Sequence, residues 1–317
     1  MRPPILYYRA RRFFPRPLQV GVRRAHACIR RRATAATWPI DQLAGDTPRG
    51  FLGWPEGKRF ALVLRHDVES RVGAANALRL AAVEESRGLR SAFYFVPRGY
   101  GDTGRIRSIL ASRGFEIGVH GLTHDGLLYA SHQSFLRCST EINDFLNDWQ
   151  SVGFASPSSH HEFEWLHELD IEYDTSSFDT DPFEPQPDGI RTIFPVSQWD
   201  QQRKHLYIEL PYTFAQDFTV FVILGHKDTA LWTRKLDWIV DHGGMALLVT
   251  HPDYVVFPGD RRRSFTYDLG LYERFLDYVR QRYGDSCWYA LPRDVARYWR
   301  DSVATQTEPP RNRQDVR

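Results

Sequence analysis

The chain has 317 residues, of which 42% are hydrophobic and 14% aromatic, so it has ample apolar material for a large core and is not a disordered polypeptide. The net charge of +2 hides an asymmetry, because residues 1–40 hold ten arginines and no Asp, Glu or Lys, whereas the remainder, with 31 basic and 39 acidic residues, carries −8. An acidic body argues against nucleic acid as the main partner.

The basic residues at the start of the chain are interspersed with aromatic residues such as Tyr7, Phe13 and Phe14. This pattern is compatible with peripheral contact between residues 1–32 and an anionic membrane, with a solvated arm, or with a helix packed on the domain through salt bridges. No apolar run near the start has the roughly 7–15 residues of a secretion signal, and none approaches the ~20 residues of a membrane-spanning helix. We therefore expect a cytoplasmic protein, with membrane contact as one option.

From Phe60 onward, strand and helix patterns alternate. We expect strands over 60–64, 91–96, 115–120, 153–157, 171–177, 206–212, 245–251 and 287–292. We expect helices over 73–88, 104–114, 131–153, 162–169, 231–244, 267–284 and 292–299. Residues 179–205 hold four prolines and are predicted to be a long irregular insertion. Continuous apolar strands between helices indicate a parallel sheet, either open or closed into a barrel.

Metal-binding residue types follow three of these strands directly. The strands end in Arg65-His66-Asp67-Val68-Glu69, in His120 followed by His124, and in His251 followed by Asp253. Because the carboxyl ends of parallel strands meet at one edge, these side chains are predicted to form a site for a first-row metal ion. The widely spaced Cys28, Cys138 and Cys287 indicate neither a disulfide framework nor a cysteine zinc site.

The segment FEIGVHGLTH (115–124) resembles the second motif of the polysaccharide deacetylases, carbohydrate esterase family four. ALVLRHDVE and LLVTHPD stand where that family has its first and last motifs, and the resemblance spans about residues 60–295. It is closest to a bacterial subgroup with His-Asp-Val-Asp in the first motif. The resemblance implies an incomplete (β/α)7-type barrel. It also implies metal-dependent removal of N-acetyl groups from a sugar or a surface-polysaccharide precursor.

On this resemblance, the chain divides into a basic arm and irregular lead-in (1–55), a catalytic domain (56–302) and a polar, disordered tail (303–317). The expected cofactor is one divalent metal ion, with zinc favoured and iron, cobalt or nickel as alternatives. The expected substrate is a carbohydrate, lipid-linked or nucleotide-linked, because a cytoplasmic enzyme does not meet the mature cell-wall polymer.

The resemblance also implies roles for individual residues. His120 and His124 correspond to metal ligands, and His251 corresponds to the general acid. Residues i and i+2 of a strand share a face, so Asp67 and Glu69 can reach one site. We expect Asp67 as the third ligand and Glu69 as the base, with the exchange of these roles left open. His66 should point away from the site.

The residues that contact substrate are expected in the later motifs and in the 179–205 insertion. Pro157, Tyr212, Asp217 and Asp253 are the candidate substrate-binding residues. Tyr212 is one of four aromatic residues that could stack on sugar rings, the others being Phe214, Phe218 and Tyr254.

One departure from the family pattern bears on activity. Ala155 stands where the family has an arginine that orients the base, and His160, His161 or Arg65 could replace it. If none does, the chain is a catalytically inactive carbohydrate-binding homologue. A third alternative is an enzyme that hydrolyses a non-sugar C–N amide bond, such as that of a cyclic ureide, on the same fold.

Overall fold

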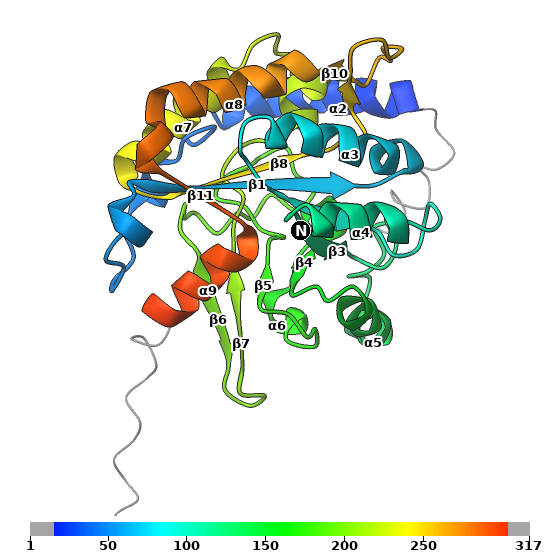
Figure 1. Cartoon of the computed structure of the whole chain (residues 1–317), viewed down its shortest axis with the longest axis vertical. Helices are drawn as coiled ribbons and strands as arrows, with labels where there is room; N and C mark the ends of the chain where they lie inside the picture. Colours follow the sequence, from blue (N-terminus) through cyan, green and yellow to red (C-terminus); the bar gives the residue numbers. More distant parts are fainter. Residues whose placement is uncertain (1–15, 304–317) are drawn as a thin grey trace, which may run out of the picture.

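The computed structural model describes residues 16–303, and the described chain is built around one curved, mostly parallel sheet (Figure 1). Within these residues nine strands make up the sheet. Their order is β11 (Cys287–Ala290), β1 (Phe60–Val68), β2 (Ala92–Phe95), β3 (Glu116–His120), β4 (Gly153–Ala155), β5 (Tyr173–Asp174), β7 (His205–Glu209) and β6 (Val196–Asp200), with β8 (Met245–Thr250) also paired to β1. Every pairing is parallel except that of β6 with β7.

Strand β1 is the centre of the sheet because three neighbours pair with it. Its first half pairs with β11, its second half pairs with β2, and β8 runs along it from Ala61 to His66. All nine residues of β1 are buried, including the charged residues at its end. A buried strand that continues into charged residues carries those charges into the interior, where they need partners.

The sheet curls without closing. The segment after β7 approaches β8, where Thr213 donates its backbone N–H to the carbonyl of Leu247 and its hydroxyl to the carbonyl of Met245. No strand ladder among the described residues joins β7 to β8 at this point. The incomplete α/β barrel predicted from the sequence is therefore confirmed.

Helices lie around the outside of the sheet (Figure 1). They are α3 (Arg71–Glu85), α4 (Gly104–Ser112), α5 (His132–Asp148), α6 (Phe163–Leu166), α7 (Ala230–His242), α8 (Leu269–Tyr283) and α9 (Pro292–Ser302). Ser70 and Ser131 cap α3 and α5 by accepting backbone N–H groups of the first turn. These elements agree with the predicted ones to within a few residues, except that the long helix predicted to reach 153 ends at Asp148.

Short elements complete the described chain. They are the 3₁₀ turns η1 (Gln42–Gly45), η2 (Pro55–Gly57), η3 (Pro157–Ser159) and η5 (Gly284–Ser286), the π-helical η4 (Phe218–Ile223), and the paired strands β9 (Val255–Val256) and β10 (Tyr267–Asp268). The prediction that all of 179–205 is irregular was wrong for its second half. There, β6 pairs with β7 as an antiparallel hairpin at the edge of the sheet, and its residues are only partly buried.

The basic start of the chain contains a helix that the sequence pattern left undecided. Helix α2 (Arg16–Ala33) docks on the domain through Val20 and Ala27, which are both 3% exposed. Arg24 donates a hydrogen bond from Nε to the carbonyl of Val222, and Arg30 donates one to the carbonyl of Pro182. The docked-helix alternative therefore holds for 16–33, although the contacts described are apolar burial and hydrogen bonds to carbonyl groups where salt bridges were expected. Residues 1–15, and all of the predicted tail except Val303, lie outside the described residues.

Candidate active site

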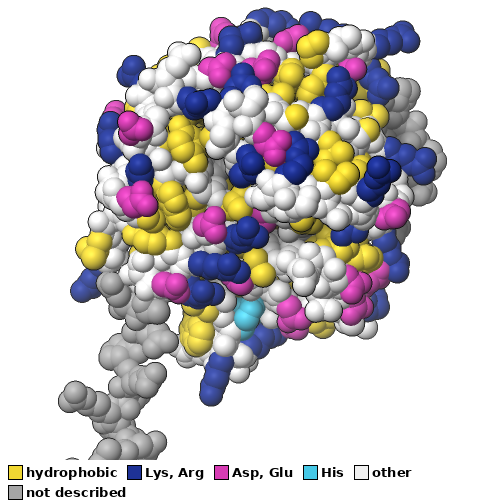
Figure 2. All heavy atoms as spheres, viewed as in Figure 1, with side chains coloured by type: hydrophobic (Ala, Val, Ile, Leu, Met, Phe, Trp, Pro, Cys, Tyr) yellow, Lys and Arg dark blue, Asp and Glu magenta, His cyan; other side chains and the backbone are white. Residues whose placement is uncertain are grey.

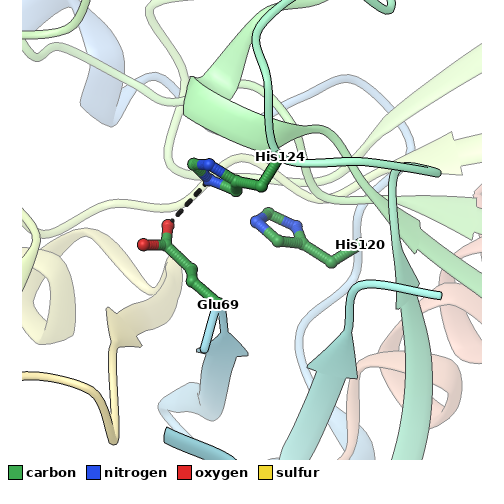
Figure 3. A group of neighbouring side chains, drawn as sticks. All are labelled: Glu69, His120 and His124. Atoms are coloured by element: carbon green, nitrogen blue, oxygen red, sulfur yellow. Dashed lines mark ion pairs between the residues drawn. The ribbon is translucent and has the colours of Figure 1, made fainter. Parts of the chain in front are cut away.

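Side chains that follow β1 and β3 meet at the carboxyl edge of the sheet. Glu69, His120 and His124 each offer one ligand atom, and these atoms lie within 4.8 Å of one another (Figure 3). His124 Nε2 is 2.9 Å from Glu69 Oε1. Burial would raise the pKa of Glu69, but His124 and His251 hold that pKa well below its usual range. The cluster therefore combines a carboxylate with two imidazoles, a donor set that suits a divalent cation.

His120 is oriented by the neighbouring strand. Its Nδ1 is 3.0 Å from the carbonyl oxygen of Ala155, and since a carbonyl only accepts, we assign the proton to Nδ1. Its Nε2 is buried and has no hydrogen-bond partner among the described residues. Burial lowers the pKa of His120 to about 4, so the ring is neutral. A neutral ring whose free lone pair points into a polar cluster is suited to bind a metal ion.

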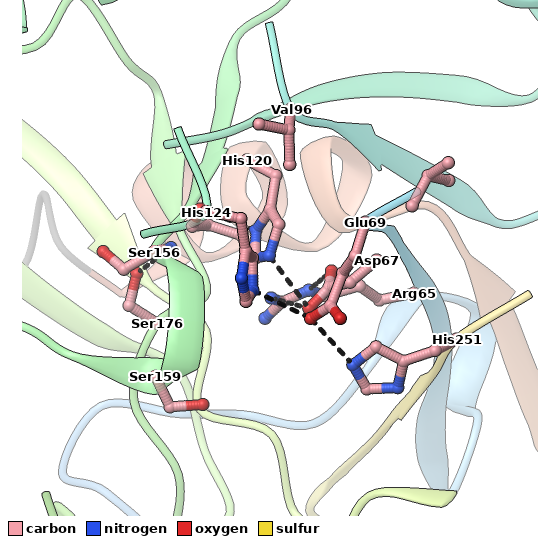
Figure 4. Close-up of polar contacts among 12 residues, drawn as sticks. Arg65, Asp67, Glu69, Val96, His120, His124, Ser156, Ser159, Ser176 and His251 are labelled. Atoms are coloured by element: carbon pink, nitrogen blue, oxygen red, sulfur yellow. Dashed lines mark hydrogen bonds and ion pairs between the residues drawn. The ribbon is translucent and has the colours of Figure 1, made fainter. Parts of the chain in front are cut away.

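Asp67 lies beside the cluster but is held by another residue. Arg65 donates from Nε to Oδ1 at 2.8 Å and from Nη2 to Oδ2 at 2.6 Å (Figure 4). Burial would raise the pKa of Asp67, but Arg65 and then His120 lower it below its usual value. Oδ2 of Asp67 is 3.9 Å from His120 Nε2. Asp67 is therefore an ionised carboxylate at the edge of the cluster.

Arg65, one of the three residues expected to replace the arginine missing at Ala155, contacts Asp67 directly. Its ion pair with Asp67 is buried, and its guanidinium also contacts Thr175 and the face of Tyr94. His161, a second candidate, points its Nδ1 toward the carbonyl of Ser159 at 3.1 Å.

His251 follows β8 and faces the cluster from the opposite side. Asp217 accepts hydrogen bonds from its Nδ1 at 2.7 Å and from its backbone N–H at 2.8 Å. Nε2 of His251 is 3.7 Å from Glu69 Oε1 (Figure 4). Burial alone would lower the pKa of His251, but Asp217 and Glu69 raise it to about 10. His251 therefore carries a proton that it can present to the cluster.

His66 points away from the site, as the alternation along a strand predicts. Its Nε2 is 2.6 Å from Glu84 Oε1, and its Nδ1 is 2.7 Å from the hydroxyl of Thr250. Tyr272 donates a hydrogen bond to the same carboxylate. These contacts join β1 to the helices that cover it, so His66 has a structural role.

A cavity of about 650 Å³ opens above the cluster. It is lined by the catalytic candidates Asp67, Glu69, His124 and His251, by Phe183, Glu184 and Pro185 of the 179–205 insertion, by Phe218 and Tyr254, and by Val22, Arg23, His26 and Arg30 of α2. A volume of this size is in the range of small-molecule sites. The α2 residues are among those in this wall that the sequence did not predict, because a docked helix far from the motifs leaves no local signal.

Of the predicted substrate-binding residues, only Asp253 is among those that line this cavity. Its carboxylate accepts hydrogen bonds from the Ser70 hydroxyl and from the backbone N–H of Glu69. Asp217 lies behind His251 instead. Pro157 packs at Gly121, where a Cβ would be 2.6 Å from its ring. Tyr212 is 1% exposed and accepts a hydrogen bond from Gln216, which does line the cavity.

Tyr254 makes a contact in the site that the sequence motifs do not predict. Its hydroxyl donates to Glu69 Oε2 at 3.1 Å, and its ring lies 4.6 Å from that of Phe218. From the sequence, both residues are expected only as aromatics that stack on a sugar ring. In the structure, Tyr254 also fixes a carboxylate of the cluster.

No protein-family model and no curated protein matches the chain. Solved structures do resemble it. A protein of Mycobacterium smegmatis assigned as a polysaccharide deacetylase is 19% identical, with a TM-score of 0.58 over 83% of this chain and 96% of the other. The PuuE allantoinase is 15% identical, with a TM-score of 0.60 over 83% and 97%.

A second protein assigned as a polysaccharide deacetylase, from Pseudomonas aeruginosa PAO1, is 16% identical, with a TM-score of 0.57 over 79% of this chain and 94% of the other. At these identities the likeness shows a shared fold. The chain therefore has the fold of the polysaccharide deacetylases, which is the fold that its motifs predict.

Proposed function

We propose that this protein is a metal-dependent hydrolase of the polysaccharide deacetylase type that removes N-acetyl groups from a sugar. The observation that carries the proposal is the meeting of three kinds of group at one strand edge. A carboxylate lies with two histidines, a second carboxylate is held ionised by an arginine, and a protonated histidine faces both. General acid–base hydrolysis of an amide at a metal site can use these three kinds of group as metal ligands, base and acid.

We assign the metal ligands as Glu69, His120 and His124. The buried, partnerless Nε2 of His120 and the low pKa of Glu69 fit a cation at this position. This assignment exchanges the roles expected for Asp67 and Glu69 from the sequence. A donor set of two imidazoles and one carboxylate suits zinc, and also iron, cobalt or nickel. A bound divalent ion would polarise the amide carbonyl and lower the pKa of a water molecule.

Asp67 and His251 would move the protons. Asp67, kept ionised by Arg65, accepts a proton from the attacking water, whose oxygen forms the new bond to the amide carbon. His251 donates its Nε2 proton to the amide nitrogen as the C–N bond breaks, which yields acetate and a free amine. Asp217 holds the His251 ring in the orientation for this transfer.

The cavity wall supports a substrate with an anionic group. The guanidinium of Arg23 lies 5.0 Å from the centre of the Phe218 ring and lines the cavity. Its positive charge partly offsets the effect of burial on the pKa of Glu184, which lines the same cavity. A phosphate is a good partner for such a guanidinium. We therefore favour a lipid-linked or nucleotide-linked sugar, in the cytoplasm, over a neutral polymer.

Two alternatives are separated by one assay. The cavity would also hold a small cyclic amide, and a homologue without turnover would retain the same shape. We would incubate the purified protein, with and without a chelator, with N-acetylated sugars and with cyclic ureides. The proposal expects acetate release that the chelator abolishes. Ureide hydrolysis alone supports the second function, and no turnover of either class at full metal content supports the inactive homologue.

A further inference from the structure

Helix α2 exposes an apolar stripe on the side opposite its docked face. Leu18, Val22 and Ile29 are 52%, 61% and 73% exposed, and their spacing places them on one side of the helix. Val20 and Ala27, which dock on the domain, project from the other side. A single exposed leucine is normal on a protein surface. An aligned row of exposed apolar side chains on a helix whose other side is already docked indicates a second contact surface.

Positive charge surrounds helix α2. The helix contains no acidic residue, and Arg24, on its docked side, shares a hollow with Lys227, Arg262 and Arg263. The loop that contains Arg261–Arg263 is exposed and leads into β10, beside α2 in Figure 1. On the face shown in Figure 2, by contrast, basic and acidic side chains are interspersed. A helix without acidic residues and an adjacent loop with three consecutive exposed arginines therefore give this part of the surface an excess of positive charge.

The same surface borders the mouth of the catalytic cavity. Val22 belongs to the stripe and also lines the cavity, as do Arg263 and Phe265 from the loop before β10. Val72, at the start of α3, lines the cavity as well and is 43% exposed. A surface that covered the stripe would therefore also lie against the entrance to the site.

We propose that Leu18, Val22, Ile29 and Arg261–Arg263, here called the docking face, bind an anionic lipid bilayer, so that the cavity opens toward the lipid headgroups. Apolar side chains would enter the boundary between headgroups and acyl chains, and the arginines would pair with lipid phosphates. A second copy of the chain is a poorer occupant, because a two-fold interface would set these arginines against one another.

This inference rests on the proposed function, and it adds to that function the class of substrate. With its cavity open toward a bilayer, the enzyme would take an N-acetylated sugar carried on a lipid phosphate. Among the described residues, no helix has the length and apolar character needed to cross a membrane. The attachment we infer is therefore made by the surface of α2 and the adjoining loop.

The test is co-sedimentation of the full-length protein with vesicles of phosphatidylcholine, alone or mixed with phosphatidylglycerol. Leu18→Glu/Ile29→Glu removes the stripe without altering a cavity residue, and Leu43→Glu/Leu52→Glu changes two leucines that are also exposed but lie on the lead-in segment. All proteins keep residues 1–15. We expect the first variant to bind mixed vesicles at least about tenfold more weakly than the wild type, and the second to bind like the wild type.

Charge is tested with Arg261→Gln/Arg262→Gln, which should weaken binding and reduce its salt dependence. Equal binding by the wild type and the stripe variant would overturn the proposal, as would equal wild-type binding to neutral and mixed vesicles. Conversion of a wild-type dimer to a monomer by the stripe variant would also overturn it, in favour of a second copy. Vesicle binding requires no turnover, so it can fail or succeed independently of the acetate-release assay. In that assay, the stripe variant should match the wild type on a soluble N-acetyl sugar.

Discussion

Arg65 and Asp67 lie two residues apart on β1 and form a two-point ion pair inside the sheet, with N–O distances of 2.8 and 2.6 Å. Residues i and i+2 share a strand face, so the pair is built into the strand itself. An arginine supplied from within the first motif can therefore orient the neighbouring carboxylate, which the methyl group of Ala155 cannot do.

Arg65→Lys should lower kcat by about 100-fold, because an ammonium group cannot hold both oxygens of Asp67 in one geometry. Metal content should stay at the wild-type level, since the side chain of Arg65 donates its hydrogen bonds to Asp67 and Thr175 and not to the proposed ligands. Arg79→Lys is the control, because its ion pair with Asp260 is exposed and contributes little. Wild-type turnover by Arg65→Lys would exclude Asp67 as a base that depends on this pair.

Arg23→Gln should raise KM for a phosphorylated N-acetyl sugar roughly 10-fold or more and leave KM for the unphosphorylated sugar unchanged. The reason is that the Arg23 guanidinium is expected to pair with the phosphate group of the substrate and with no other part of the sugar. Arg113→Gln, which removes an arginine paired with Glu85 outside the cavity, is the matched control. An equal change in KM for both sugars would show that Arg23 shapes the cavity and does not recognise charge.

Glu116→Gln should change how stability depends on pH. Burial raises the pKa of Glu116 from 4.5 to about 7, so the folded chain keeps a proton that the unfolded chain releases. This proton contributes to the free energy of unfolding fully below pH 4.5, and the contribution is lost as the pH rises to about 7. The loss is on the order of 3 kcal/mol.

The glutamine variant lacks this titration, so its free energy of unfolding relative to the wild type should increase across that pH range. Urea unfolding at several pH values measures it, and the exposed Glu56→Gln is the control. A constant difference between Glu116→Gln and the wild type would show that Glu116 does not hold a proton in the folded state.

Two glycines within helices give a paired test of the contacts behind the site. A Cβ at Gly73 of α3 would come within 2.1 Å of Asp253 Oδ2, whereas a Cβ at Gly21 of α2 meets nothing within 4 Å. Gly73→Ala should therefore cost about 1–3 kcal/mol of stability and reduce activity, because Asp253 must leave the backbone of Glu69. Gly21→Ala should stabilise by about 0.5–1 kcal/mol. Thermal unfolding and acetate release distinguish the two, and an unperturbed Gly73→Ala would mean that Asp253 has room to move.

Most of the fold could be predicted from the sequence because its strands are continuous apolar runs and its helices have clear periodicity and caps. Strand β6 was missed because its partly exposed residues form a strand only by pairing with β7. Helix α2 was left undecided because its docking depends on contacts with Val222 and Pro182, far along the chain. Long-range contacts of this kind leave no periodic signal at either partner.

The site was predicted in part. The strand ends pointed to His120, His124 and His251, which the structure brings together with Glu69. The roles of Asp67 and Glu69 could not be separated, because both share a strand face and both are carboxylates. The two carboxylates differ only in their ion-pair partners in the folded chain: Asp67 pairs with Arg65, and Glu69 pairs with His124.

The most direct test of the proposed metal hydrolase is the metal content of Glu69→Gln and Asp67→Asn, measured beside acetate release. We expect Glu69→Gln to lose both the bound metal and activity. We expect Asp67→Asn to keep stoichiometric metal while its turnover falls by about 10²–10⁴. Metal retained by Glu69→Gln and lost from Asp67→Asn would contradict the assignment, and a wild-type protein without any divalent ion would contradict the metal site itself.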